Sequence, residues 1–244
     1  MTSRWKKIGI FFMAVVLTSG LALAQESEWE NLKVLPKDIS KQKLNGVMKA
    51  WSKALGVRCN FCHVGESGAP LSTYDFASDE KHEKDIARMM VDMTKAINGD
   101  HLSKLNEGNH KASINCATCH HGLAHPRTLE EILAINLRRK GIDGAVKRYY
   151  SLREKYYGTD SMDFSEGSLG NFAYRLTSQG KPDEALRFLA VNLEFYPKSA
   201  QTYFLIGEAH AKKGDKPEAL KAMEKSLALE PNPNVKERIA ELKK

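Results

Sequence analysis

The sequence predicts an all-α protein with two different helical parts. Residues 44–56 and 86–98 align with each other without gaps, and in both segments apolar residues recur at the three- and four-residue spacing of a helix. From about residue 166, a second pattern repeats every 34 residues. No strand pattern surrounds the four cysteines of the chain. We therefore expect a helical domain followed by an array of helical hairpins.

The N-terminus has the features of a cleavable signal peptide. Basic residues within the first seven positions precede an apolar run over residues 8–17, and residues 22–24 read Ala-Leu-Ala, an A-x-A cleavage site. This order predicts a signal peptide over residues 1–24 and an exported, periplasmic protein. The apolar run is too short to predict a membrane span. Its retention as an anchor is the alternative.

The net charge gives no indication of a nucleic-acid partner. The chain of 244 residues has a formal charge of +7, and removal of the three basic residues of the signal peptide lowers this to +4. The sequence contains no cluster of lysine and arginine with interleaved aromatic residues. We therefore expect no nucleic-acid binding, and the charge favours an acidic redox partner only mildly.

All four cysteines fall within two CxxCH motifs, at residues 59–63 and 116–120. Two cysteines at this spacing, followed directly by histidine, are typical of covalent haem attachment. The thiols form thioethers with the haem vinyl groups, and the adjacent imidazole can bind the iron. The motifs thus predict two haem c groups. The predicted attachment residues are Cys59, Cys62, Cys116 and Cys119, and the predicted proximal ligands are His63 and His120.

Two other uses of the cysteines are open from sequence. A zinc ribbon would use both pairs in one site, but its pairs are usually about 15–20 residues apart, whereas here residues 63–115 separate them. Zinc also gives no reason for a histidine after each pair. Two short disulfides are the other alternative in an exported protein.

The helical repeat predicts the second ligand of each iron. Met48 and Met90 occupy equivalent positions in the two segments, before the first and second motifs respectively. A methionine thioether is a common haem ligand and raises the reduction potential. We therefore predict Met48 and Met90 as distal ligands, with Met93 as the alternative to Met90. Packing of these methionines in an apolar core is the other interpretation.

Other histidines give weaker predictions. His101 or His110 is an alternative to Met90 as the ligand of the second iron. His121 and His125 follow the second motif closely enough in sequence to contact a haem propionate.

The motifs over residues 40–127 resemble the cytochrome c subunit of photosynthetic reaction centres. The matching stretches read MKAWSKALGVRCNFCH from residue 48, ARMMVDMTKAINGDHL from residue 87 and INCATCHHG from residue 114. The resemblance implies a unit of helix, axial methionine, turn and CxxCH, which pairs Met48 with the first motif and Met90 with the second. Classical members of that family contain four haems, whereas this chain contains the motifs of one two-haem half.

The 34-residue pattern is typical of tetratricopeptide (TPR) repeats, which have small residues at the helix crossing and proline at the end. The repeats are predicted over residues 166–199 and 200–233, with a capping helix over 234–244. Residues 129–157 predict a further helical hairpin with a turn near 141–144. Such arrays present a concave surface to protein partners. Packing on the haem domain or dimerisation is the alternative role.

Together these patterns predict an exported dihaem c-type cytochrome that transfers electrons between a redox donor and a redox acceptor. The expected organisation is a signal peptide, a dihaem domain over residues 25–127, a hairpin connector over 128–165 and a docking module of TPR repeats over 166–244. Association with a membrane complex is compatible with this organisation. An electron carrier needs no substrate chemistry. The alternatives are a dihaem peroxidase-like oxidoreductase with one open iron and a cytochrome assembly factor.

Overall fold

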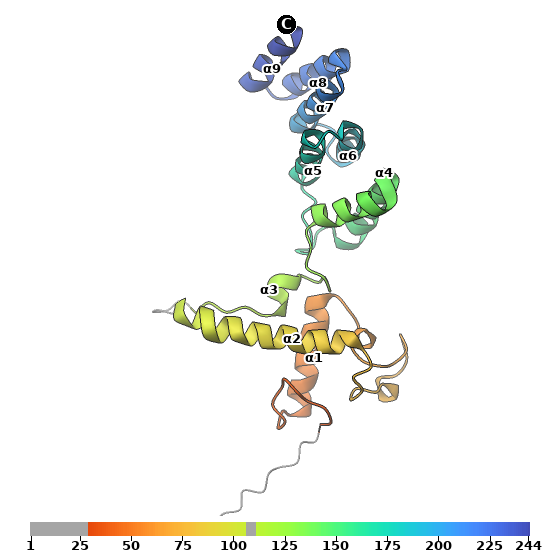
Figure 1. Ribbon diagram of the computed structural model, residues 1–244, viewed down its shortest axis with the longest axis vertical. Helices are drawn as coiled ribbons and strands as arrows, with labels where there is room; N and C mark the ends of the chain where they lie inside the picture. The colour runs from red at the N-terminus through yellow and green to blue at the C-terminus, as the bar shows by residue number, and fades with distance from the viewer. Residues whose placement is uncertain (1–28, 106–110) are drawn as a thin grey trace, which may run out of the picture.

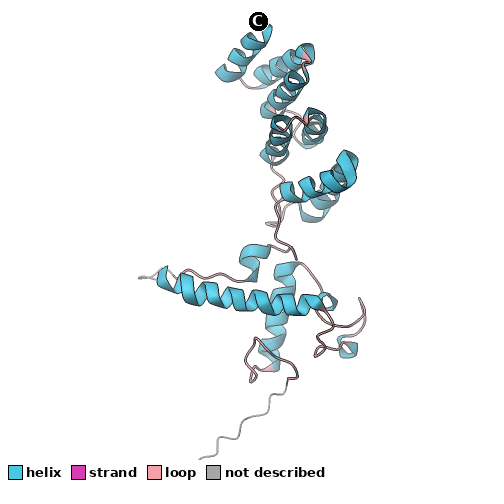
Figure 2. Ribbon diagram, in the orientation of Figure 1, coloured by secondary structure: helices cyan, strands magenta, loops and turns pink. Residues whose placement is uncertain are grey.

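The computed structural model describes residues 29–105 and 111–244. Within these ranges the longer regular elements are helices, and the only β-type pairing is an isolated bridge between Val64 and Asp75. Figure 2 shows this helical composition, which confirms the predicted all-α fold class. The predicted signal peptide lies outside the described residues.

The described part of the chain contains nine α-helices. Their bounds are α1 Lys41–Leu55, α2 His82–Ala96, α3 Cys116–His120, α4 Leu129–Tyr156, α5 Glu166–Ser178, α6 Pro182–Phe195, α7 Ala200–Lys213, α8 Lys216–Leu229 and α9 Pro233–Lys243. Figure 1 shows α1, α2 and α3 together in the N-terminal half, and α4 to α9 following in chain order toward the C-terminus.

The two helices of the N-terminal repeat are present as α1 and α2, and both begin earlier than predicted. At the start of α1 the side chain of Ser40 accepts a backbone hydrogen bond, and Gly56 ends the helix in the left-handed conformation. Helix α2 has acidic residues in its first turn, which suit the positive end of the helix dipole. It continues into a π turn, η3, at Ile97–His101.

The two cysteine motifs adopt different local structures. The second motif forms α3, and Asn115 caps it reciprocally with Thr118, which requires an asparagine or similar residue at this position. Arg58 stands before the first motif and makes no side-chain cap, and Cys59–Phe61 forms only a 3₁₀ turn, η1. A helix therefore begins at the second motif but not at the first.

Helices lie at the positions where the C-terminal hairpins are predicted. Helix α4 is broken at Gly141, whose φ of 67° and ψ of −173° are not helical, so that it consists of two segments. The pairs α5–α6 and α7–α8 follow, and then the single helix α9. The small residues permit close packing, because a Cβ atom at Gly207 would lie 2.5 Å from Cγ of Met223.

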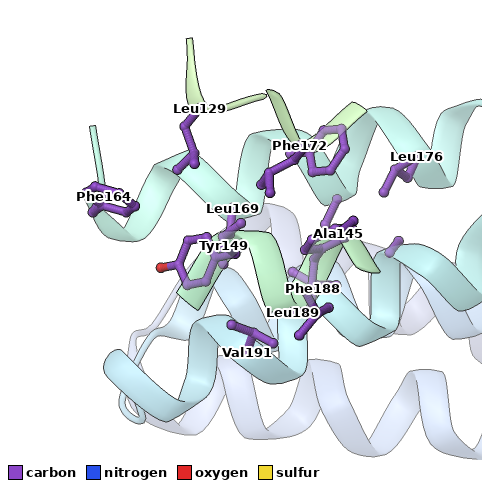
Figure 3. Close-up of a cluster of buried hydrophobic side chains, with 14 of the residues drawn as sticks. Leu129, Ala145, Tyr149, Phe164, Leu169, Phe172, Leu176, Phe188, Leu189 and Val191 are labelled. Carbon is purple, nitrogen blue, oxygen red and sulfur yellow. The ribbon is translucent and has the colours of Figure 1, made fainter. Parts of the chain in front are cut away.

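The buried apolar side chains are distributed very unevenly between the two halves. Among the described residues before Leu123, Ala54 is the only buried apolar side chain. From Leu123 onward a continuous core includes Tyr149 and Phe188, both almost fully buried (Figure 3). Burial of one large apolar side chain contributes about 1.5–3 kcal/mol, so the C-terminal half has a stabilising core of its own. The described residues before Leu123 form no comparable core of protein side chains.

Candidate haem sites

The second motif lies on a short helix that fixes the direction of its histidine. The imidazole Nδ1 of His120 is 2.8 Å from the carbonyl oxygen of Leu123. A carbonyl oxygen only accepts hydrogen bonds, so Nδ1 must be protonated in this contact and Nε2 retains its lone pair. This is the tautomer that a metal-binding histidine needs, and a hydrogen bond of this kind orients the ring. The geometry of His120 therefore fits an iron ligand.

The first motif presents its histidine in a different environment. His63 is half-buried, and its Nδ1 is buried and has no hydrogen-bond partner among the described residues. The edge of its ring meets the ring of Phe76, with 5.0 Å between centroids. Burial lowers the pKa of His63, and the positive charges of Lys84 and Arg88 lower it further, although an interaction with the backbone of Phe76 opposes them in part. The imidazole is therefore held neutral, as ligation of iron requires.

A loop and a set of charges connect the first motif to α2. The ammonium of Lys84 on α2 donates hydrogen bonds to the carbonyl oxygens of Phe76, Ala77 and Ser78, at 2.7–3.0 Å. It also pairs with Asp79 at 3.2 Å. The loop that contains Phe76 is thus tied to the first turns of α2, which keeps the Phe76 ring against His63.

Asp79 joins this loop to two other parts of the domain. Its carboxylate contacts Lys33 at 2.6 Å and Arg88 at 2.8 Å, as well as Lys84. The amide of Asn31 donates to the same carboxylate at 2.8 Å. The hydrogen bond from Lys33, followed by those from Lys84 and Arg88, holds the pKa of Asp79 well below its usual range. The carboxylate therefore stays ionised and links the N-terminal segment, the loop and α2.

None of the four cysteines is joined to another cysteine in the structure. Burial raises the pKa of the Cys116 thiol, and burial followed by the negative charge of Glu83 raises that of Cys62. In the described ranges no group of three or more His, Cys, Asp or Glu side chains converges as a metal site would require. The structure therefore does not join the two cysteine pairs in a single zinc site.

The predicted methionine ligands lie on exposed or half-exposed parts of α1 and α2. Met48 is half-buried on α1. On α2, Met90 is 38% exposed, compared with 57% for Met89 and 46% for Met93. With Ile86 they leave much of α2 apolar and accessible. An apolar surface of this kind marks a place where a ligand or partner binds, and the flat apolar faces of a haem fit it. The pairing of each methionine with one iron stays a prediction.

The second motif packs against the helix that precedes the first one. The N–H of Gly122, just after α3, donates to the carbonyl oxygen of Ala54 in α1 at 2.8 Å. Gly56 has a φ of +65°, and a Cβ atom there would lie 2.0 Å from the oxygen of Gly122. This contact requires glycine at position 56. Each motif thus borders the helix of the other repeat, since the first motif lies beside α2.

Among the described residues, the side chains of the other histidines with predicted haem roles take no part in these contacts. His101 is exposed at the end of η3, and His110 lies outside the described residues. His121 is exposed in the left-handed conformation after α3, and His125 is exposed as well. These four positions therefore stay predictions. Sequence reasoning missed Leu123 as the partner of His120 and Lys84 as the anchor of the Phe76 loop, since neither follows from motif spacing.

Comparison with known proteins identifies the N-terminal half. Residues 16–136 match the family model described as the photosynthetic reaction centre cytochrome C subunit. This part of the chain, just under half of its length, is similar to that cytochrome family. Residues 200–233 match a tetratricopeptide repeat, at the bounds predicted for the second repeat. The resemblance inferred from the motifs is therefore confirmed for both halves. The match to a cytochrome c family supports covalently bound haem c and a role in electron transfer.

Two named proteins are similar in sequence to part of this chain. The photosynthetic reaction center cytochrome c subunit of Roseobacter denitrificans is 35% identical over 96 residues, which cover 38% of this chain and 24% of that protein. Cytochrome c-554 of Chloroflexus aurantiacus is 33% identical over 106 residues, which cover 39% of this chain and 22% of that protein. The chain therefore spans about a quarter of the length of these relatives. Within the described residues, the model contains no helix with the length and apolarity needed to cross a membrane.

Proposed function

We propose that the chain is a periplasmic electron carrier with two haem c groups, each ligated by histidine and methionine. The observation that supports this most strongly is the state of the two CxxCH histidines. His120 has Nδ1 occupied and Nε2 free, and His63 is held neutral by burial and by nearby cations. Bound haem c supplies a reversible one-electron couple between ferric and ferrous iron.

The residues of the chain have separable tasks in this proposal. The cysteines of each motif attach the haem, and the histidine that follows binds the iron from one side. Met48 and Met90 would supply the second ligand of each iron and would leave no coordination position for a substrate. The cations Lys84 and Arg88 near His63 favour the less positive, ferrous form of the first haem. The haems would also supply the apolar cover that the N-terminal half lacks.

The proposal includes a docking role for the TPR module. A hollow of about 340 Å³ is lined by side chains of α5, α7 and α9. It includes Tyr174, which is 59% exposed, and Leu205, with the charged residues Glu208 and Arg238 beside them. An exposed aromatic side chain next to charged groups suits a protein partner, and we assign that partner as the electron donor or acceptor.

The test of the proposal is a redox titration of the purified protein together with ligand binding. Two reversible one-electron steps, with no binding of carbon monoxide to the reduced protein, are expected of two irons that are fully coordinated. A peroxidase-like enzyme would instead bind carbon monoxide at one haem and turn over hydrogen peroxide. Transfer of haem to an apo-cytochrome would indicate an assembly factor, and either of these results would contradict an electron carrier.

A further inference from the structure

We propose that the C-terminal helical module positions the iron ligand of the second haem through residues His121, Gly122 and Leu123, here called the strap. The hydroxyl of Ser161 holds this strap from the C-terminal side. This inference depends on the proposed function, because it assumes that His120 binds haem iron. It adds a role for residues outside the haem motifs: they couple the ligand of one haem to the packing of the helical repeats.

Leu123 is the main component of the strap. Its carbonyl oxygen accepts the hydrogen bond from Nδ1 of His120 at 2.8 Å, and its N–H donates to the carbonyl oxygen of His120 at 2.8 Å. The side chain of the same residue is only 9% exposed and belongs to the core of the C-terminal half, with Leu129, Met162 and Phe164. The position of the acceptor is therefore set by packing within the C-terminal module.

Ser161 holds the strap from the loop between α4 and α5. Its hydroxyl donates to the carbonyl oxygen of His121 at 2.6 Å, across 40 positions of sequence. A Cβ atom at Gly122 would lie 3.2 Å from the Ser161 hydroxyl oxygen, so the loop and the strap are in close contact. The next residue, Met162, is buried in the C-terminal core. One loop thus contributes both to the core and to the strap.

The other side of the strap is attached to the cytochrome half. The N–H of Gly122 donates to Ala54 at the end of α1, at 2.8 Å. The strap is therefore held between α1 and the loop of Ser161, with the His120 contact between these two attachments. A movement of the C-terminal module relative to α1 would change the hydrogen bond at Nδ1 of His120.

The first haem motif has no equivalent connection. Nδ1 of His63 is buried without a well-formed hydrogen bond among the described residues, and its polar interaction with the backbone of Phe76 stays within the N-terminal half. A hydrogen bond from Nδ1–H raises the basicity of a metal-bound imidazole, and a more basic ligand favours ferric iron and lowers the reduction potential. We therefore assign the lower potential to the second haem, and only that potential depends on the strap.

The experiment compares Ser161→Ala with the unaltered holoprotein by redox titration and by the paramagnetic NMR signals of the haem ligands. Loss of the hydroxyl weakens the support of residues 121–123, so the lower of the two potentials is expected to rise while the higher stays constant. The proximal imidazole signals of one haem should move with it. A Cys59→Ala/Cys62→Ala background, which retains the second motif alone, assigns the shifted signals to His120.

Two control variants separate positioning from general stability. Ser168→Ala removes a hydroxyl that donates to the carbonyl of Asp163 at 2.9 Å in the same segment, without contact with the strap, and should leave both potentials unchanged. Ser161→Thr keeps a hydroxyl and should restore the lower potential. Unchanged potentials and ligand signals in Ser161→Ala, even with lower thermal stability, would overturn the proposed strap. A chain without haem at Cys116–His120 would instead overturn the proposed function.

Discussion

At the scale of single residues, the two haem-motif histidines differ in what surrounds their Nδ1 atoms. His120 is hydrogen-bonded to Leu123, whereas His63 is packed against Phe76 and faces the charges of α2. Sequence spacing identifies both histidines equally and gives no sign of this difference. The difference arises from contacts that form only when the chain folds. One of them is the packing of Leu123 in the C-terminal core, which is distant in sequence.

The methionine ligands give the first prediction. Met48→Ala or Met90→Ala should each leave a vacant coordination position on one haem iron, because alanine has no thioether to bind it. The expected change is loss of methionine–iron charge-transfer absorption and a high-spin signal from one haem per chain. Met89→Ala is the matched control, since Met89 lies on the same helix as Met90 and is 57% exposed. A high-spin signal from Met89→Ala and none from Met90→Ala would contradict the assignment of the ligand.

Asp79 gives a prediction for pH dependence. Its pKa is lowered in the folded state by the hydrogen bond from Lys33 and by its other cationic partners, whereas an unperturbed aspartate has a pKa of about 3.9. The stability that Asp79 provides is therefore complete above that pH and is lost as the pH falls toward its lowered folded pKa. Asp79→Asn should lower the unfolding temperature at pH 6, and by a progressively smaller amount as the pH falls below about 3.9. Asp92→Asn, which removes a more exposed pair with Lys95 at 3.7 Å, should have little effect across this range.

At the scale of elements, the contact between α1 and the segment after α3 gives a prediction about glycine. Gly56→Ala places a Cβ atom against the Gly122 carbonyl and forces a left-handed backbone on alanine, which alone costs about 1–2 kcal/mol. Gly46→Ala lies in the same helix with open space around its Cβ position, and should stabilise α1 by up to about 1 kcal/mol. Chemical unfolding followed by haem absorbance compares the two. Equal effects of the two variants would contradict the close contact.

The elements also show what the sequence could and could not predict. The repeats of α1 with α2, and of α5–α6 with α7–α8, are visible as periodic apolar positions because local helix packing requires that spacing. The first motif forms only a 3₁₀ turn, and Arg58 provides no side-chain cap at the position where Asn115 caps the second motif. The packing of the second motif against α1 depends on a close contact between Gly56 and Gly122, and the first motif is connected to α2 through Lys84. Such contacts leave no periodic pattern in the sequence.

At the scale of the whole molecule, the two halves are stabilised by different means. The C-terminal helices have a continuous core, whereas Ala54 alone is buried among the apolar side chains described before Leu123. Bound haem would provide the missing apolar contacts in the N-terminal half. Figure 1 shows the helices of the two halves following one another, with the strap near the point where they meet.

This asymmetry predicts how the chain behaves without haem. In a variant with all four cysteines replaced by alanine, the N-terminal half should become sensitive to protease, because few buried contacts oppose its local opening. Helices α4 to α9 should persist as a resistant fragment, which intact-mass analysis of the digest can identify. In the holoprotein, the same digestion should leave both halves largely intact. Equal resistance of the two halves in the haem-free chain would contradict this account of the core.

The central claim is that each CxxCH motif binds one haem. The most direct measurement is the haem content of the purified, exported protein by pyridine haemochrome absorbance, together with its intact mass under denaturing conditions. The account predicts two covalently attached haems per chain, and one in either Cys59→Ala/Cys62→Ala or Cys116→Ala/Cys119→Ala. One haem or none in the unaltered protein would contradict it.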